Sequence, residues 1–220
     1  MAIKRYHASK DNTITNAFKP DLTTRATSSN MGLSDVLEVF SIYGQASGSS
    51  GLSSEEARVI ISFPTTDMAT DRTNGVIPAS GSVSFYLKMY NAEHGQTLPQ
   101  NYYMQIRAIT GSVDWQEGFG LDMESYSDST QDETGSNWVR SKGTTAWSTA
   151  GGDYSNVNTD RSSSFTQYFD NGTEDLEVDI TTLVEQWLSS SSNSGAAGIT
   201  GSKNNYGLGV MVSSSHATES

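Results

Sequence analysis

The chain contains no cysteine, and this absence excludes several kinds of site at once. With 0 Cys among 220 residues, disulfide frameworks, thiolate zinc sites and cysteine nucleophiles are ruled out. No stretch approaches the roughly 18 apolar residues of a membrane-spanning helix. The basic residues Lys4 and Arg5 are not followed by the apolar core of a secretory signal. We therefore expect a protein that is made in a cytoplasm and does not enter a membrane.

Positive charge is also scarce. The chain has 13 Lys and Arg against 25 Asp and Glu, a formal net charge of −12, and the basic residues are scattered. Such a field repels a phosphate backbone, so we predict no binding of nucleic acid. The acidic surface is interpreted as a solvated one that favours solubility.

Recognisable catalytic motifs are missing as well. The histidines His7, His94 and His216 are far apart in the sequence, and none belongs to a nucleophile, metalloprotease or phosphate-binding motif. A glycan-degrading enzyme would need a pair of carboxylates, and this is the weakest of the hypotheses considered. We predict that the protein is not an enzyme.

What the chain does contain is a series of strand patterns. Aromatic residues make up 10% of the sequence, enough to build a core. Apolar and polar residues alternate, or β-branched residues cluster, in residues 11–18, 36–44, 57–63, 82–92, 101–110, 165–181 and 205–213. We expect residues 82–92 and 101–110 to pair as a hairpin, and residues 165–181 to form two strands around a turn. The pattern predicts one all-β domain over residues 1–220, with a short N-terminal arm over about residues 1–10.

One short helix is predicted between the late strands. In DITTLVEQWL, residues 179–188, Asp179 or Thr181 can cap a helix with one apolar face. Two turns are too short to be stable alone, so that face must pack on the sheets. We therefore predict three core residues of the sandwich: Trp187, Leu183 and Phe85.

A long segment, residues 111–166, lacks a regular pattern. It contains Trp115, Trp138 and Trp147 among Gly, Asp, Ser and Thr, and irregular segments of this length usually have a function or a core of their own. The favoured interpretation is that the tryptophans form such a core. The alternative is a sugar-stacking surface made by Trp138, Trp147 and Tyr154.

The same segment holds a group of carboxylates. The candidate metal ligands are Asp114, Glu117, Asp122 and Asp128, since Ca²⁺ takes six to eight oxygen ligands. Their spacing is not that of a known calcium loop. The favoured interpretation is that these acids are solvated or accept backbone N–H groups, with no cofactor, and a structural Ca²⁺ is the alternative.

In their order, several motifs resemble DNRLRE-type domains, which are similar to carbohydrate-binding modules and have a jelly-roll fold. The motifs are RVIISF at 58–63, VSFYL at 83–87, WQEG at 115–118, Trp147 followed by Gly151 and Gly152, VDITTLVEQW at 178–187 and NYGL at 205–208. The resemblance covers most of the chain. It implies an all-β jelly-roll sandwich with one short helix and a long irregular loop.

A second resemblance is narrower. Residues 23–45, TTRATSSNMGLSDVLEVFSIYGQ, are similar to structural proteins of marine tailed bacteriophages, many of which run further at the C-terminus. It implies a virion protein made in the bacterial host cytoplasm, with other virion proteins and copies of itself as partners. Its role would be capsid decoration or a part of the neck, tail or fibre. The alternative function is binding of host-surface glycans, and the arm of residues 1–10 is expected to be ordered only by a partner.

Overall fold

The computed structural model describes residues 3–43, 54–95, 98–111, 114–121, 125–126, 134–190 and 203–213. Within them the protein is mostly β-strand, with two short α-helices. The strands are β1 (Lys10–Thr15), β2 (Phe40–Tyr43), β3 (Ser54–Ser62), β4 (Tyr86–Met89), β5 (Tyr102–Ala108), β6 (Arg140–Lys142), β7 (Thr145–Ala146), β8 (Ser164–Phe169), β9 (Leu176–Asp179) and β10 (Leu208–Val212). The helices are α1 (Thr65–Thr73), α2 (Thr181–Ser190) and a 3₁₀ turn, η1 (Arg161–Ser163). No described helix is long and apolar enough to cross a membrane.

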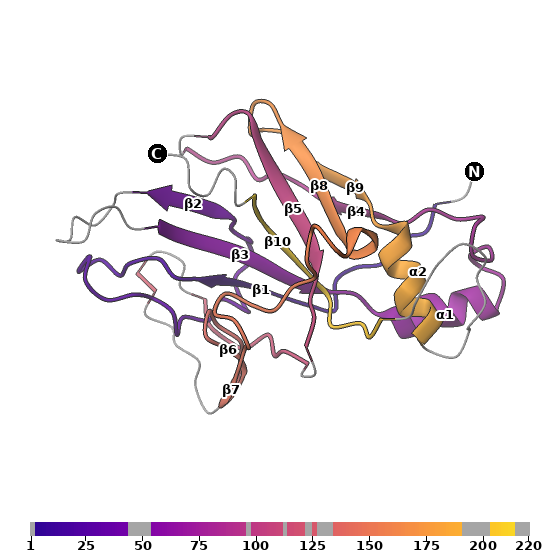
Figure 1. Ribbon diagram of the computed structural model, residues 1–220, viewed down its shortest axis with the longest axis horizontal. Coiled ribbons are helices and arrows are strands. Elements are labelled where there is room, and N and C mark those ends of the chain that lie inside the picture. The colour runs from indigo at the N-terminus through magenta and orange to yellow at the C-terminus, as the bar shows by residue number, and fades with distance from the viewer. Residues whose placement is uncertain are drawn as a thin grey trace.

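A six-stranded antiparallel sheet forms the centre of the molecule (Figure 1). Its order is β1-β3-β10-β5-β8, with β2 pairing with β3 as well. β10 lies between β3 and β5, so that Leu208 faces Ile61 on one side and Ala108 on the other. A second layer is the antiparallel pair β4–β9, and β6–β7 is a small separate hairpin. The predicted all-β class is confirmed.

The main core lies between the large sheet and the second layer. Because side chains alternate along a strand, Val59 and Ile61 of β3 point to one face and Ile60 to the other. The first face packs on Leu87 of β4 and Val178 of β9. Helices α1 and α2 contact each other at one end of the sheet (Figure 1) and contribute to the same core.

Helix α2 forms where the sequence predicts it. The Asp179 carboxylate accepts the Thr181 N–H at 2.9 Å, and the Thr181 hydroxyl accepts the Phe85 N–H at 2.8 Å. Leu183 and Trp187 are buried in the main core, whereas Phe85 is half-buried against it. The helix therefore covers one end of the core with its apolar face, as its pattern indicates.

The prediction of a single helix is wrong, because α1 is a second one. It begins after Pro64 and buries only one apolar side chain, that of Met68. With so weak a stripe, the helix has no clear periodic signal. Its position depends on a contact that is distant in sequence, the ion pair between Arg72 and Glu185 of α2.

The predicted hairpin of residues 82–92 with 101–110 is wrong, whereas residues 165–181 do form two strands around a turn, β8 and β9. β4 pairs with β9, not with β5, and β8 pairs with β5, not with β9. The chain changes layer between β4 and β5 and again between β8 and β9. Alternation identifies which side chains are buried but not which strand lies alongside. In addition, the expected strand over 36–44 is reduced to β2, and Val36 is exposed.

The N-terminal arm, which was expected to be ordered by a partner, packs on the domain of its own chain. Tyr6 and Ala8 pack against the main core, and the Ser9 N–H donates to the Ser62 carbonyl at 2.8 Å. The Asp71 carboxylate at the end of α1 accepts the Tyr6 hydroxyl at 2.6 Å and pairs with Lys4 at 2.5 Å. Residues 3–9 are therefore part of the domain.

Tyr6→Phe is expected to lower the melting temperature by a few degrees at neutral pH, because it removes the hydroxyl that donates to Asp71. The ammonium of Lys4 and the Tyr6 hydroxyl hold the pKa of Asp71 below its ordinary value. A carboxyl with a depressed pKa stabilises the fold above its unfolded pKa, and this contribution is lost as the pH falls through the folded pKa.

The difference between wild type and Tyr6→Phe should therefore shrink below about pH 4. Thermal melts from pH 7 to pH 3 measure it, with Tyr90→Phe, a change at an exposed tyrosine, as the control. Equal melting temperatures at pH 7 would show that the Tyr6–Asp71 hydrogen bond does not contribute to stability.

Candidate binding surfaces

The tryptophans of the irregular segment lie inside the protein. Trp115, Trp138 and Trp147 pack with Ile14 and Ile60 on the second face of the large sheet, with exposed fractions of 1%, 7% and 7% for the three indoles. We call this group the tryptophan cluster. The Trp115 indole donates to the Tyr206 carbonyl at 2.8 Å, and the Trp147 indole donates to the Asn137 carbonyl at 2.9 Å.

The proposed sugar-stacking surface is therefore not formed by these residues. Trp138 and Trp147 pack in a cluster that includes Ile14 and Ile60 of the sheet, and the Arg58 guanidinium of β3 lies 4.8 Å from the centre of the Trp138 ring. Tyr154 packs against the cluster too. Its ring lies so close to β10 that a Cβ at Gly209 would be 2.2 Å from it. Burial raises the pKa of the Tyr154 hydroxyl to about 12.

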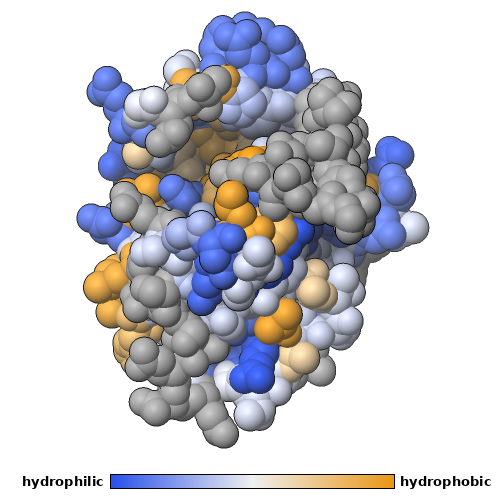
Figure 2. Space-filling model, turned by 90° about the vertical axis from the view of Figure 1, so that its left-hand side faces the viewer, coloured by the Kyte–Doolittle hydropathy of each residue, from blue (hydrophilic) through white to orange (hydrophobic). Residues whose placement is uncertain are grey.

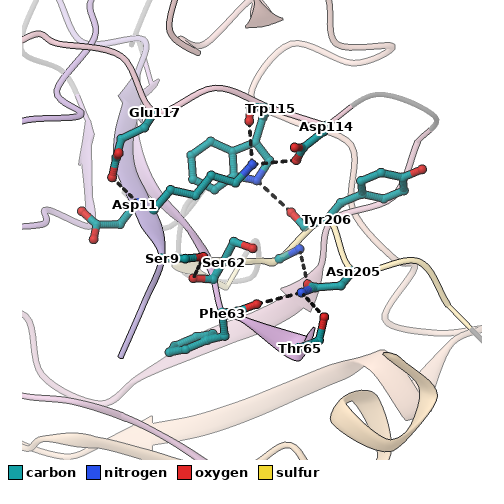
Figure 3. Close-up of polar contacts among 12 residues, drawn as sticks. Ser9, Asp11, Ser62, Phe63, Thr65, Asp114, Trp115, Glu117, Asn205 and Tyr206 are labelled. Atoms are coloured by element: carbon teal, nitrogen blue, oxygen red, sulfur yellow. Dashed lines mark hydrogen bonds and ion pairs between the residues drawn. The ribbon is translucent and has the colours of Figure 1, made fainter. Parts of the chain in front are cut away.

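The described carboxylates of the predicted metal group hold the irregular segment to β1 (Figure 3). Lys10 donates to the Asp114 carboxylate at 2.6 Å and to the Trp115 carbonyl at 2.7 Å, and its ammonium lies 4.4 Å from the centre of the Trp115 ring. Glu117 accepts the Asp11 N–H at 2.8 Å. Burial raises the pKa of the Asp11 carboxyl, and the neighbouring Glu117 raises it further.

These contacts anchor the irregular segment to strand β1. Asp122 and Asp128 lie outside the described residues, and within the described ones no group of three or more His, Cys, Asp or Glu could hold a metal ion. Nearby, the Asn205 amide donates to the Phe63 carbonyl at 2.9 Å and to the Thr65 hydroxyl at 3.2 Å (Figure 3). The segment before β10 is thereby tied to the end of β3.

A buried asparagine organises the segment further, and the sequence pattern did not indicate it. The Asn30 amide nitrogen donates to the carbonyls of Glu117 at 2.6 Å and Ser136 at 2.8 Å. Its oxygen accepts the N–H groups of Gly120 at 2.8 Å and Gly32 at 3.3 Å. One side chain therefore joins three stretches that are distant in the sequence.

Glycines surround this asparagine because nothing larger fits. A Cβ at Gly120 would lie 1.7 Å from the Asn30 carbonyl oxygen. At Gly118, whose φ is +93°, it would lie 2.3 Å from the Asn30 side-chain oxygen. Real Cβ atoms do not approach so closely, so the glycines in the sequence were the signal that could have indicated a buried, tightly packed side chain here. We call Asn30 and the backbone groups that it binds the Asn30 hub.

Asn30→Ala is expected to lower the free energy of unfolding by about 2–3 kcal/mol, because the Glu117 carbonyl and the buried N–H groups of Gly32 and Gly120 lose their partner. Urea denaturation measures the loss. The control is Asn158→Ala, at an exposed asparagine, which should change stability by no more than about 0.5 kcal/mol. If both variants unfold at the same urea concentration, the hub has no energetic importance.

Next to the Asn30 contacts in the sequence are four exposed apolar residues, Leu33, Val36, Phe119 and Leu121, which we call the exposed apolar group. Its exposed fractions are 53% for Leu33, 46% for Val36, 73% for Phe119 and 60% for Leu121. The two segments that carry these residues are joined by the Leu33 N–H, which donates to the Gly120 carbonyl at 2.9 Å, and by the Ser34 hydroxyl, which donates to the Leu121 carbonyl at 3.0 Å. These contacts place the apolar side chains on a well-defined base.

Figure 2 shows one end of the molecule, where hydrophobic residues form separate patches among hydrophilic ones. Large apolar side chains that are exposed together are typical of protein–protein interaction sites.

A second exposed surface lies on the outer face of β5 and β8. Tyr103 and Tyr168 face each other across the two strands, with ring centres 5.1 Å apart and exposed fractions of 44% and 45%. The Tyr168 hydroxyl donates to the Asn101 side chain at 2.6 Å. Along the same face follow Gln105 and then Arg107, whose Nε donates to the Ser155 carbonyl at 2.7 Å. The terminal nitrogens of Arg107 make no ion pair within the described part of the chain.

Sequence alternation places Tyr103 and Tyr168 each on an outward face, but only the pairing of β5 with β8 brings them together. Comparison with known proteins yields no match, whether to a protein-family model, to a curated protein or to a solved structure. The contacts described above are therefore the basis of the proposals that follow.

Proposed function

We propose that this protein is a non-enzymatic structural component of a bacteriophage particle, acting in assembly or stabilisation of the virion, and that its domain is a jelly-roll sandwich. The observation that carries the proposal is the exposed apolar group on its rigid base. Leu33 and Val36 belong to the stretch of residues 23–45 that resembles bacteriophage structural proteins. The capsid surface, neck, tail and fibre are all locations consistent with this role.

The irregular segment supports a structural role rather than a chemical one. Its tryptophans form a core, and Asp114 and Glu117 hold the loop to β1. A segment stabilised in this way presents a fixed surface, and pre-organised surfaces lose little entropy when they bind a partner. Other virion proteins are therefore the proposed partners of the apolar group.

Mass spectrometry of purified particles of the encoding phage tests the proposal, and absence of the protein from the particles would overturn it. A phage that carries Phe119→Ser and Leu121→Ser should then incorporate much less of the protein. Both residues are exposed, so the purified variant should melt close to wild type. Tyr90→Ser, at an exposed residue beside β4, is the matched control and should be incorporated normally.

A second candidate function, binding of a host-surface glycan, is favoured by the pair of Tyr103 and Tyr168. Aromatic faces pack well on sugar rings, and the neighbouring Gln105 and Thr166 side chains can exchange hydrogen bonds with hydroxyl groups. A glycan array with the purified protein tests this function. Tyr168→Ala should abolish any signal and Tyr86→Ala, at an exposed tyrosine on β4, should leave it unchanged.

A further inference from the structure

Within the described part of the chain, strand β8 is an open edge of the large sheet. All six of its residues, Ser164–Phe169, pair in unbroken register with Tyr102–Arg107 of β5. Among the described residues, no backbone hydrogen bond joins residues 164–169 to anything but β5. Within these described segments, the N–H and C=O groups on the outer side of β8 therefore have no backbone partner.

The opposite edge of the sheet, β1, is contacted by other segments of the chain. Along β1, Glu117 accepts the Asp11 N–H, and Asn12 and Thr13 accept N–H groups from the segment of residues 31–38. Natural sheets usually protect an edge in this way, or with charged residues, proline or a bulge. β8, with the sequence SFTQYF, has no charge, no proline and no bulge.

We propose that β8 pairs antiparallel with β8 of a second copy of this chain, forming a two-fold dimer with one continuous sheet. An uncharged edge suits self-association in a chain with a net charge of −12, since no like charges are opposed along the strand. A two-fold axis also pairs the same surface with itself, the commonest arrangement in homodimers. The inference goes beyond the proposed virion role and does not depend on it.

The two ends of β8 carry complementary charges. Arg161, at the start of the η1 turn that leads into the strand, is exposed and makes no ion pair within the described residues. Asp170, immediately after it, is exposed as well. Antiparallel pairing brings the beginning of one strand to the end of the other. Each Arg161 would therefore lie near Asp170 of the second copy.

The alternation of side chains restricts the register. Directly opposed residues must point to the same face of a sheet, so the two-fold axis must pass through a residue and not between two residues. With Thr166 on the axis, Ser164 faces Tyr168 of the second copy. An axis at Gln167 is disfavoured, because the Gln167 side chain already bridges to Asp175 and Glu177.

The absence of cysteine from the chain makes a cross-linking test simple. Thr166→Cys places two thiols opposite each other at the axis, with Cβ atoms about 4.5–5.5 Å apart, close to the range that a disulfide bridges. Mild oxidation should give a disulfide-linked dimer on a non-reducing gel. Gln105→Cys, on the interior strand β5 of the same sheet face, is the matched control and should form no disulfide, so that it runs as a single chain on the same gel.

Mass measurement of the purified protein tests the dimer independently. Light scattering should give twice the chain mass of 23.7 kDa for wild type, and Thr166→Lys, which opposes two ammonium groups at the axis, should give the monomer mass. Arg161→Glu should weaken the dimer about tenfold or more by opposing like charges, and adding Asp170→Arg should restore it. A monomeric wild type, or a dimer that survives Thr166→Lys, would overturn the inference.

Discussion

Replacing Trp187 by alanine is expected to lower the free energy of unfolding by about 3–5 kcal/mol, the usual cost of emptying a large buried aromatic site. Trp187 is 2% exposed and lies on the face of α2 that covers the main core, beside Leu183 and Val184. The helix has ten residues, too few for stability in isolation. Its attachment therefore depends on this apolar face.

Urea denaturation and thermal melts of Trp187→Ala measure the loss. Trp138→Ala and Trp147→Ala, in the separate tryptophan cluster, should cost less and leave the main core intact. Phe119→Ala, at an exposed aromatic residue, should change stability by no more than about 0.5 kcal/mol. A Trp187→Ala protein that melts within a degree or two of wild type would mean that α2 does not hold the core closed.

Replacing Glu185 by alanine is expected to cost about 3 kcal/mol, because it leaves the Arg72 guanidinium without its counter-charge in a largely buried position. The two side chains form a bidentate pair with both N–O distances at 2.6 Å. Glu185 is 1% exposed and Arg72 15% exposed. The remaining exposure of Arg72 places the expected cost at the lower end of the range for breaking buried pairs.

A double variant separates the charge from the packing. Arg72→Met combined with Glu185→Leu removes both charges and keeps apolar volume between α1 and α2, so it should unfold within about 1 kcal/mol of wild type. Chemical denaturation of the two single variants and the double variant completes the cycle. If Glu185→Ala and the double variant lose the same stability, packing and not the ion pair holds α1 in place.

Several features of the fold follow from local pattern alone. The β-branched cluster in residues 57–63 predicts β3, and alternation along residues 101–110 predicts β5, because a strand with one face in a core buries every second residue. The segment after Asp179 predicts α2 and the burial of Leu183 and Trp187 by the same logic with the helical period. These residue patterns lie within single segments, so they can be recognised without knowing how distant segments pack.

Other features depend on contacts between segments that are distant in the sequence. The partners of β4 and β8 depend on how the chain moves between the two layers. The alternation of apolar and polar residues along a strand does not indicate which layer that strand joins. Helix α1 has a weak apolar stripe and is held by Arg72 on Glu185, 113 positions away. The Asn30 hub likewise joins residues 87 to 106 positions apart.

The candidate surfaces, too, depend partly on local sequence pattern and partly on contacts between distant segments. The sequence by itself determined an all-β domain with an acidic surface and an aromatic core, because composition and periodicity report burial. Only the tertiary structure decided that Trp138 and Trp147 are internal, that Tyr103 and Tyr168 form an exposed pair, and that β8 is an open edge. Whether a side chain is covered, and by what, depends on which strands and loops pack together, and that packing is a property of the whole chain.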